Sequence, residues 1–169
     1  ALCDQDDIWL PGKIEILQRE LNNGYDLVAS DLSVVDANGN LISESFEKYQ
    51  GIYIPSLSEQ YRFLVFRNSF TGCTMLAKRE FLLSCLPIPP EALVHDWWFA
   101  VIAAARGKGV GYVRQQLVQY RRHDLNAIGA HSMKKEKLDA FFRFFSGQRQ
   151  SYLQSRFSGY ADRVSCYIS

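Results

Sequence analysis

Three carboxylates lie within four positions near the start of the chain, at Asp4, Asp6 and Asp7. Clustered like charges need either solvent or a cation. At the carboxyl end of a strand in an open α/β sheet, such side chains point into the crevice where ligands bind. Two carboxylates one residue apart can then hold a divalent cation that contacts phosphate oxygens. The alternative is that Asp6 or Asp7 caps the next helix or shapes a turn, and this short motif favours neither interpretation.

A fourth carboxylate, Asp96, precedes an apolar segment in the sequence His95-Asp96-Trp97-Trp98. Taken alone, the segment favours a carboxylate that caps a helix. The functional alternative is a general base at the mouth of a pocket, beside an indole that packs against a sugar ring. Neighbours on a helix cannot both face one ligand, so we retain one tryptophan, Trp97, as a candidate.

Cationic side chains close the last predicted strand, in the sequence Tyr120-Arg121-Arg122-His123. Alternation along a strand sends Arg121 and His123 to one face and Arg122 to the other. Arginine and histidine together suit a diphosphate and a metal ion. The local sequence by itself favours a solvated strand end. A separate loop of small residues, 68–73, contains Gly72, which would let the backbone approach a ligand closely.

Alternating helices and strands must position these side chains. Apolar spacing and capping residues predict helices at 11–22, 55–67, 78–86 and 97–106. Strands are predicted at 25–30, 110–113 and 117–122, and Asn38-Gly39 between two apolar runs predicts a hairpin. Residues 1–3 are typical of the end of a strand, and an amphipathic helix is predicted from Met133 to about Tyr160. The sequence therefore predicts an α/β domain.

The composition predicts a globular domain, because 47% of the 169 residues are hydrophobic. Lys and Arg number 19 against 18 Asp and Glu, so the formal charge of +1 gives no reason to expect nucleic-acid binding. The four cysteines form no CxxC pair, which argues against a zinc or redox motif and favours a reducing compartment. The longest apolar run, 97–105, is shorter than the roughly 20 residues that span a bilayer. We therefore expect a soluble cytoplasmic chain that can work at the inner face of the membrane.

Five segments, taken in order, resemble the family-2 glycosyltransferases of the GT-A fold. They are DQDDIWLPGKIE (Asp4 to Glu15), DLVASDLSVVDANGNLI (Asp26 to Ile42), NSFTGCTMLAKRE (Asn68 to Glu80), HDWWFAVIAAARG (His95 to Gly107) and LVQYRRHDLNAIGA (Leu117 to Ala130). The resemblance covers residues 1–130 and is strongest to bacterial enzymes that build surface polysaccharide, rhamnosyltransferases among them. Residues 131–169 form a C-terminal helical extension outside it.

The resemblance implies a nucleotide-diphospho-sugar donor, a saccharide or lipid-linked saccharide acceptor, and Mg²⁺ or Mn²⁺. Asp4 and Asp6 match the family's DxD motif, whose carboxylates serve the donor and the metal. His123 falls where many members carry a late metal-binding histidine. Arg121 and Arg122 are expected beside the diphosphate.

On the acceptor side, the resemblance makes Asp96 the catalytic base that takes the proton from the attacking hydroxyl. Thr71, Gly72 and Trp97 are expected to line the acceptor side. One base without a separate nucleophile implies direct displacement with inversion, unlike the paired carboxylates of glycoside hydrolases.

One departure from the family concerns the N-terminal half, which carries the first strand, a helix and the residues that hold the nucleotide base. This sequence begins near the DxD motif. We therefore expect a partial GT-A fold, with a mixed sheet flanked by helices and the Rossmann-like half missing. The open sheet edge is expected to permit self-association, and the fragment alone to be inactive. Two other hypotheses remain: a non-catalytic carbohydrate-binding or assembly module derived from such an enzyme, and a sugar-nucleotide hydrolase.

Overall fold

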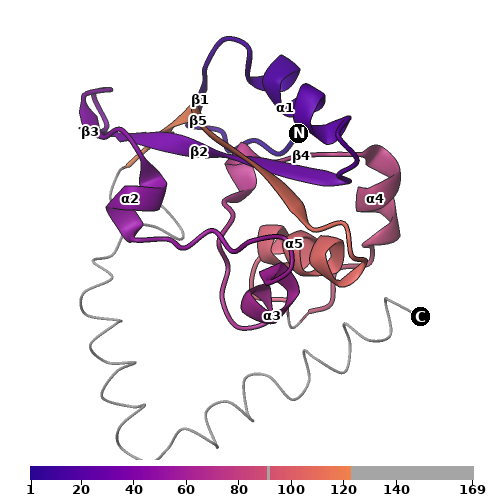
Figure 1. The fold of residues 1–169 in the computed structure, drawn as a ribbon. Helices are drawn as coiled ribbons and strands as arrows, with labels where there is room; N and C mark the ends of the chain where they lie inside the picture. The colour runs from indigo at the N-terminus through magenta and orange to yellow at the C-terminus, as the bar shows by residue number, and fades with distance from the viewer. Residues whose placement is uncertain (91, 123–169) are drawn as a thin grey trace, which may run out of the picture.

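The computed structural model describes residues 1–90 and 92–122 as helices packed around one mixed sheet (Figure 1). The strands are β1 (Ile8–Trp9), β2 (Leu27–Val35), β3 (Leu41–Ser43), β4 (Leu76–Ala77) and β5 (Val110–Arg121). Their order is β1-β5-β2-β3, and β4 also pairs with β2. β2 and β5 are parallel, whereas the other pairs are antiparallel. The predicted α/β class with a mixed sheet flanked by helices is confirmed.

β2 is the central strand, and all nine of its residues are buried. Leu27 and Ala29 belong to the core cluster that includes α5, whereas Val28 packs with Leu17 of α1. This alternation follows from the period of two in a strand. Because helices cover both faces, β2 has no polar solvent face of the kind that an open antiparallel sheet shows.

Five α-helices and one 3₁₀ turn are described. They are α1 (Lys13–Leu21), α2 (Phe46–Gln50), α3 (Gln60–Leu64), η1 (Gly72–Thr74), α4 (Arg79–Ser84) and α5 (His95–Ala105). In Figure 1, α1 lies on one face of the sheet, and α3 and α5 lie on the other. Seven of the eleven α5 residues are buried, which confirms the prediction of a buried helix.

The hairpin predicted around Asn38-Gly39 is confirmed by the β2–β3 pair. Other boundaries differ from the prediction. The two strands predicted at 110–113 and 117–122 form the single strand β5. The helix predicted at 55–67 is reduced to α3, and residues 57–59 before it form turns. Residues 1–3 form no strand, although the Leu2 N–H donates to the Met75 carbonyl (3.1 Å).

The first helix begins at Lys13 rather than at Pro11. Gly12 precedes it with φ of 82°, a left-handed conformation that glycine adopts without steric cost. The buried stripe is Lys13, Leu17 and Leu21, while the apolar Ile14 is 39% exposed. A lysine therefore occupies a position on the stripe where an apolar residue is usual.

Residues 123–169, including His123 and the predicted C-terminal amphipathic helix, lie outside the described residues. Within residues 1–90 and 92–122, none of the helices combines the length and the apolar character needed to cross a bilayer. The outer strands β1 and β3 expose Ile8, Trp9, Leu41 and Ile42. Self-association through a sheet edge stays a prediction.

Candidate active site

The acidic segment that follows the N-terminal residues brings Asp4 and Asp7 beside the Cys73 thiol. One ligand atom from each of these three side chains lies within 4.8 Å of the other two. Asp7 Oδ1 accepts from the Arg121 backbone N–H (3.3 Å), at the end of β5. Asp7 Oδ2 is buried and has no hydrogen-bond partner among the described residues. The structure therefore groups Asp4 with Asp7, and it leaves the predicted metal role of Asp6 untested.

These groups suit a hard divalent cation better than a soft one. Burial and the Asp7 charge raise the pKa of Cys73 far above its usual value, so the thiol stays protonated. Carboxylate oxygens remain as the donors from Asp4 and Asp7, and Mg²⁺ and Mn²⁺ prefer oxygen. The orphaned Asp7 Oδ2 fits such a ligand, because a buried carboxylate oxygen without a partner is costly.

Neither Asp6 nor Asp7 caps the first helix. The residue before α1 is Gly12, and no side chain hydrogen-bonds to the free N–H groups there. The Asp6 carbonyl accepts from Arg121 Nε (3.3 Å). Burial raises the pKa of Asp7, and the charges of Asp4 and Asp6 add to that increase. The capping alternative for the acidic segment is therefore wrong.

Asp96 is the second residue of α5, and its carboxylate accepts from the Trp97 N–H of its own helix (2.6 Å) as well as from η1. The Gly72 N–H donates to Oδ2 (2.8 Å), and Asn68 Nδ2 donates to Oδ1 (3.3 Å). The residue before α5 is Val94, so the prediction that Asp96 is the N-cap is wrong. Burial raises the pKa of Asp96 although the Gly72 and Trp97 N–H groups lower it. A raised pKa suits a group that must take up a proton.

Asp96 and the acidic segment share one electrostatic environment. The Asp4 carboxylate is near enough to raise the pKa of both Asp96 and Asp7. Gly72 lies between these groups, and a Cβ there would meet Asp96 Oδ2 at 3.2 Å and His95 Nε2 at 3.3 Å. A side chain at position 72 would therefore crowd the Asp96 carboxylate and the His95 ring, which would have to shift by a few tenths of an ångström. The fold brings together Asp4, Gly72 and Asp96, although Gly72 and Asp96 lie about 70 and about 90 residues after Asp4 in the sequence.

The two predicted diphosphate arginines are engaged with the protein. Arg121 donates to the Asp6 carbonyl and, through Nη1, to the Ala37 carbonyl (2.9 Å). Arg122 Nη1 donates to the Tyr49 hydroxyl (2.8 Å). Arg121 thus ties the end of β5 to the acidic segment, and the diphosphate role of both arginines stays a prediction.

The tryptophans after Asp96 use their indole N–H groups in the fold. Trp97 Nε1 donates to the Leu64 carbonyl of α3, and Trp98 Nε1 donates to the Cys85 carbonyl (3.0 Å). Trp98 is fully buried, as expected for a core residue, whereas Trp97 is half-buried. The acceptor-side role of Trp97 stays a prediction, because these contacts do not test it.

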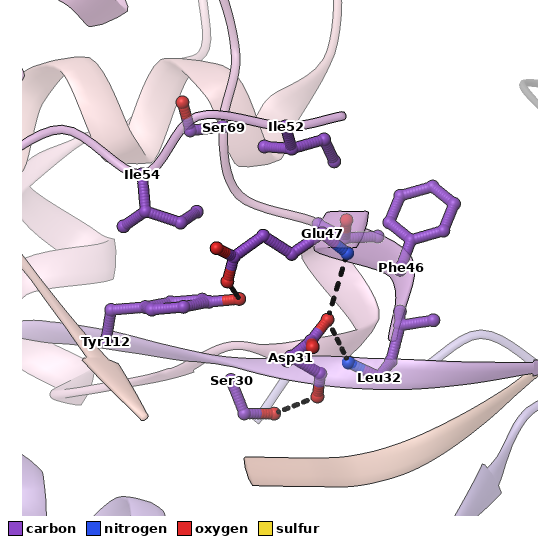
Figure 2. Close-up of a pocket in the computed structure, with 10 residues that line it drawn as sticks. Ser30, Asp31, Leu32, Phe46, Glu47, Ile52, Ile54, Ser69 and Tyr112 are labelled. Atoms are coloured by element: carbon purple, nitrogen blue, oxygen red, sulfur yellow. Dashed lines mark hydrogen bonds between the residues drawn. The ribbon is translucent and has the colours of Figure 1, made fainter. Parts of the chain in front are cut away.

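A small pocket lies beside the predicted acceptor loop, between β2, α2 and the segment before η1 (Figure 2). Thr71 is one of its lining residues, and Ile52, Ile54 and Ser69 line it from the same segment. Glu47 reaches from α2 toward the Tyr112 hydroxyl, which donates to its carboxylate (3.3 Å). The pocket's carboxylates already have donors, so its polar groups are satisfied by the protein.

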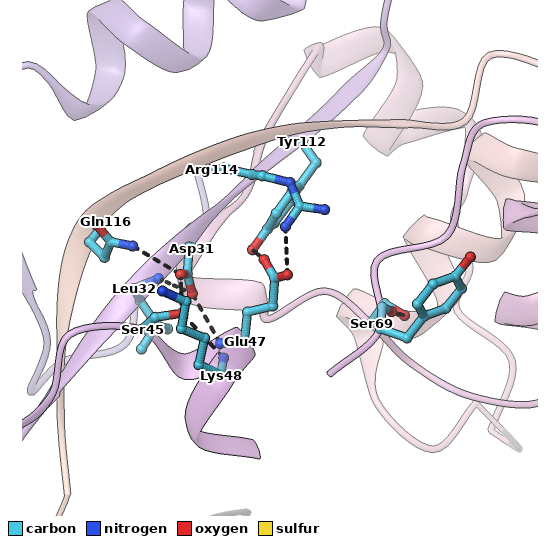
Figure 3. A network of polar contacts seen from close by, with 10 residues as sticks. Asp31, Leu32, Ser45, Glu47, Lys48, Ser69, Tyr112, Arg114 and Gln116 are labelled. Carbon is cyan, nitrogen blue, oxygen red and sulfur yellow. Dashed lines mark hydrogen bonds and ion pairs between the residues drawn. The ribbon is translucent and has the colours of Figure 1, made fainter. Parts of the chain in front are cut away.

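Asp31 is the centre of that satisfied network (Figure 3). Its Oδ2 accepts from Ser45 Oγ (2.6 Å) and Gln116 Nε2 (3.0 Å). Its Oδ1 accepts from the backbone N–H groups of Leu32 (2.9 Å) and Glu47 (3.2 Å). The β2–β5 register shifts on both sides of Asp31, so this carboxylate joins an irregular part of the sheet to α2.

Comparison with known proteins gives one distant relative and no matching family model. Over 147 residues, the chain is 25% identical to the dTDP-rhamnosyl transferase RfbG of Shigella flexneri. The likeness is to a glycosyltransferase. It covers 81% of this chain but 47% of the relative, so the chain spans about half the length of the protein it matches. No protein-family model matches the sequence. The distant relative supports a glycosyltransferase role, at the level of a broad relationship.

Two residues of the site were missed by sequence reasoning. Lys13 is 1% exposed, and its Nζ donates to the Cys73 carbonyl (2.7 Å). Its position four residues before Leu17 was the available signal, because it places a lysine on the buried stripe. Cys73 carried no such signal, since only the folding of η1 against the acidic segment brings its thiol to Asp4 and Asp7.

Proposed function

We propose that the protein containing this chain transfers a sugar from a nucleotide-diphospho-sugar to a saccharide acceptor, with inversion, in surface polysaccharide synthesis. The glycosyltransferase role has the support of the distant RfbG relative. Because that relative is named as a dTDP-rhamnosyl transferase, dTDP-rhamnose is the first donor to test. The acceptor is a saccharide or a lipid-linked saccharide, and the reaction takes place at the cytoplasmic face of the membrane.

Asp96 is the proposed catalytic base, and its environment is the observation that carries the proposal. Its carboxylate is held by the Gly72 N–H at 2.8 Å, and burial raises its pKa. It can accept the proton of an acceptor hydroxyl as the hydroxyl oxygen bonds to the anomeric carbon and the nucleoside diphosphate leaves. Attack from the side opposite the leaving group inverts the anomeric configuration.

Asp4 and Asp7 are the proposed ligands of a divalent cation, Mg²⁺ or Mn²⁺. Their oxygens lie within 4.8 Å of each other, and Asp7 Oδ2 has no partner among the described residues. When bound, the cation supplies charge stabilisation to the departing diphosphate. The roles of Asp6 and His123 in the same site come from the family resemblance and stay predictions.

The direct test incubates the full-length protein with dTDP-rhamnose, Mn²⁺ and a panel of saccharide acceptors. We expect a glycosidic product of inverted anomeric configuration, loss of product with EDTA and its recovery with added Mn²⁺. A product with retained configuration would contradict the role of Asp96. Acceptor binding without transfer from any nucleotide-sugar would support the non-catalytic module instead, and donor breakdown without acceptor would support the hydrolase.

A further inference from the structure

Lys13, the first residue of α1, is almost completely buried at 1% exposure. Lysine is rarely this buried unless its charge has partners. Nζ donates to the Cys73 carbonyl (2.7 Å) and lies 3.8 Å from the centroid of the Trp9 ring. The ammonium group therefore joins α1, β1 and η1 instead of reaching solvent.

The segment that Lys13 holds connects the two halves of the candidate site. The Cys73 thiol lies beside Asp4 and Asp7, while the neighbouring Gly72 N–H donates to Asp96. Within this turn, the carbonyls of Thr71 and Gly72 each accept from the backbone N–H group three residues ahead. The Cys73 carbonyl instead accepts from Lys13. Lys13 is thus one of the contacts that attach η1 to the rest of the fold, beside the hydrogen bond from Gly72 to Asp96.

The local sequence explains why Lys13 points inward. Gly12 has φ of 82°, which turns the chain sharply into α1. Positions 13, 17 and 21 are four residues apart, so Lys13 shares the buried stripe with Leu17 and Leu21. No salt bridge neutralises Lys13 within residues 1–90 and 92–122, and its charge acts on Asp4 and Asp7 nearby.

We propose that Lys13 is a positioning residue for sugar transfer, which fixes η1 so that the Gly72 N–H stays on Asp96 beside the acidic segment. The kinetic consequence rests on the proposed function. The effect on the Gly72 contact does not, because that contact can be measured without any substrate.

The test compares Lys13→Met with Leu17→Ala in the full-length protein. Methionine keeps the length of the side chain but removes the donor and the charge. Leu17 is fully buried on the same helix, so Leu17→Ala destabilises α1 without touching Cys73. In Lys13→Met we expect an upfield shift of the Gly72 amide proton and at least tenfold faster exchange with solvent. In Leu17→Ala, measured at the same interval below its own melting temperature, the Gly72 amide proton keeps its chemical shift.

Kinetics supply the second measurement. Lys13→Met is expected to lower kcat at least tenfold with less than a twofold change in the donor KM, whereas Leu17→Ala keeps kcat per folded molecule. Lys13→Arg, which retains a charged donor, should recover part of the loss. If Lys13→Met does not fold, Lys13→Leu, which also removes the donor and the charge, is read in the same way.

An unchanged Gly72 amide in the Lys13 variant, or an equal change in Leu17→Ala, would overturn the proposal. If the unsubstituted protein transfers no sugar to any acceptor, the proposed function fails, and the Gly72 amide still decides the role of Lys13.

Discussion

Asp31 in the central strand β2 and Asp7 just before the outer strand β1 are both drawn into the fold, yet their surroundings differ. Asp31 accepts four hydrogen bonds, two on each oxygen. Asp7 Oδ1 accepts from the Arg121 N–H, and the neighbouring Cys73 thiol lowers the pKa of Asp7 as a weak donor, but its buried Oδ2 forms no hydrogen bond of normal geometry among the described residues. Neighbouring charges add to the contrast, because Asp4 and Asp6 raise the pKa of Asp7 further.

The difference separates carboxylates that build the fold from carboxylates that are kept for a ligand. A fully bonded buried carboxylate stabilises one arrangement of its neighbours. Raised carboxyl pKa values cluster at functional sites, and a buried oxygen without a partner, such as Asp7 Oδ2, costs stability. We assign the first role to Asp31 and the second to Asp7 and Asp96, whose pKa values burial raises, together with the neighbouring Asp4. The following substitutions test that assignment.

The largest effect is expected for Asp96→Asn. Loss of a general base lowers the transfer rate by roughly 10²- to 10⁴-fold, while donor binding in the presence of Mn²⁺ is retained. Glu80→Gln is the matched control, because Glu80 is also an acidic residue in the first turn of a helix, α4, and is exposed. Turnover by Asp96→Asn close to that of the control would remove Asp96 from the base role.

Asp31→Ala is expected to act on stability instead. It leaves four donors without an acceptor, so the free energy of unfolding should fall by about 3 kcal/mol. Asp31→Asn should cost less, because the Gln116 amide can turn and present its oxygen to the new amide group. Denaturant unfolding measures both variants, and transfer per folded molecule should stay normal.

The surface carboxylate Asp26 gives the control for that experiment. It pairs with Lys78 and Lys108, both at 2.9 Å, and these lysines are 40% and 51% exposed. Asp26→Asn should cost roughly 0–1 kcal/mol. A loss as large for Asp26 as for Asp31 would mean that buried hydrogen bonds are not what distinguishes the Asp31 network.

Asp7→Asn is expected to weaken Mn²⁺ binding in the presence of a nucleoside diphosphate by about tenfold, because a charged oxygen ligand is lost. Asp6→Asn should have the smaller effect, since the structure groups Asp7 and not Asp6 with Asp4. Calorimetric titration with Mn²⁺ decides the order. A larger loss for Asp6→Asn would favour the DxD pair that the family resemblance implies.

The smallest effect concerns pH. Because burial raises the pKa of Asp96, the transfer rate should fall as the pH drops through that raised value and protonates the base. Asn68→Ala removes a donor to the ionised form (3.3 Å), so the acid limb of the rate profile should move up by a few tenths of a unit. A downward shift would contradict this arrangement.

The same raised pKa has a consequence for stability. A carboxyl group that holds its proton more tightly when folded makes the protein less stable as the pH rises between the unfolded and folded pKa values. Asp96 and Asp7 both act in this direction, since burial raises each pKa. The free energy of unfolding therefore decreases over this pH range because Asp96 and Asp7 are buried at the site.

The sequence predicted most of the elements, because apolar periodicity and turn residues are local signals. The β2–β3 hairpin and the buried helix α5 followed from Asn38-Gly39 and from the apolar run after Trp97. Four short elements, β1, α2, η1 and β4, were not predicted. They have two to five residues, and β1 exists only because it pairs with β5.

The site was predicted in part. Asp4 and Asp96 stood out as charged residues beside apolar runs, and the fold brings their charges near each other. The place of Asp7 beside Cys73, and that of Lys13 beneath η1, depend on contacts between residues about 60 positions apart. No local pattern encodes such contacts, which form only when α1, η1 and β5 pack together.

The most direct test of the central claim, that Asp4, Asp7 and Asp96 serve one site, is paramagnetic line broadening by Mn²⁺. The full-length protein, labelled with ¹⁵N, is titrated with Mn²⁺ in the presence of a nucleoside diphosphate. We predict that the amide signals of Gly72 and Trp97 broaden at the lowest Mn²⁺ concentrations, while that of Lys108, beyond the far end of α5, broadens last. Broadening that spares Gly72 and Trp97 would contradict the account.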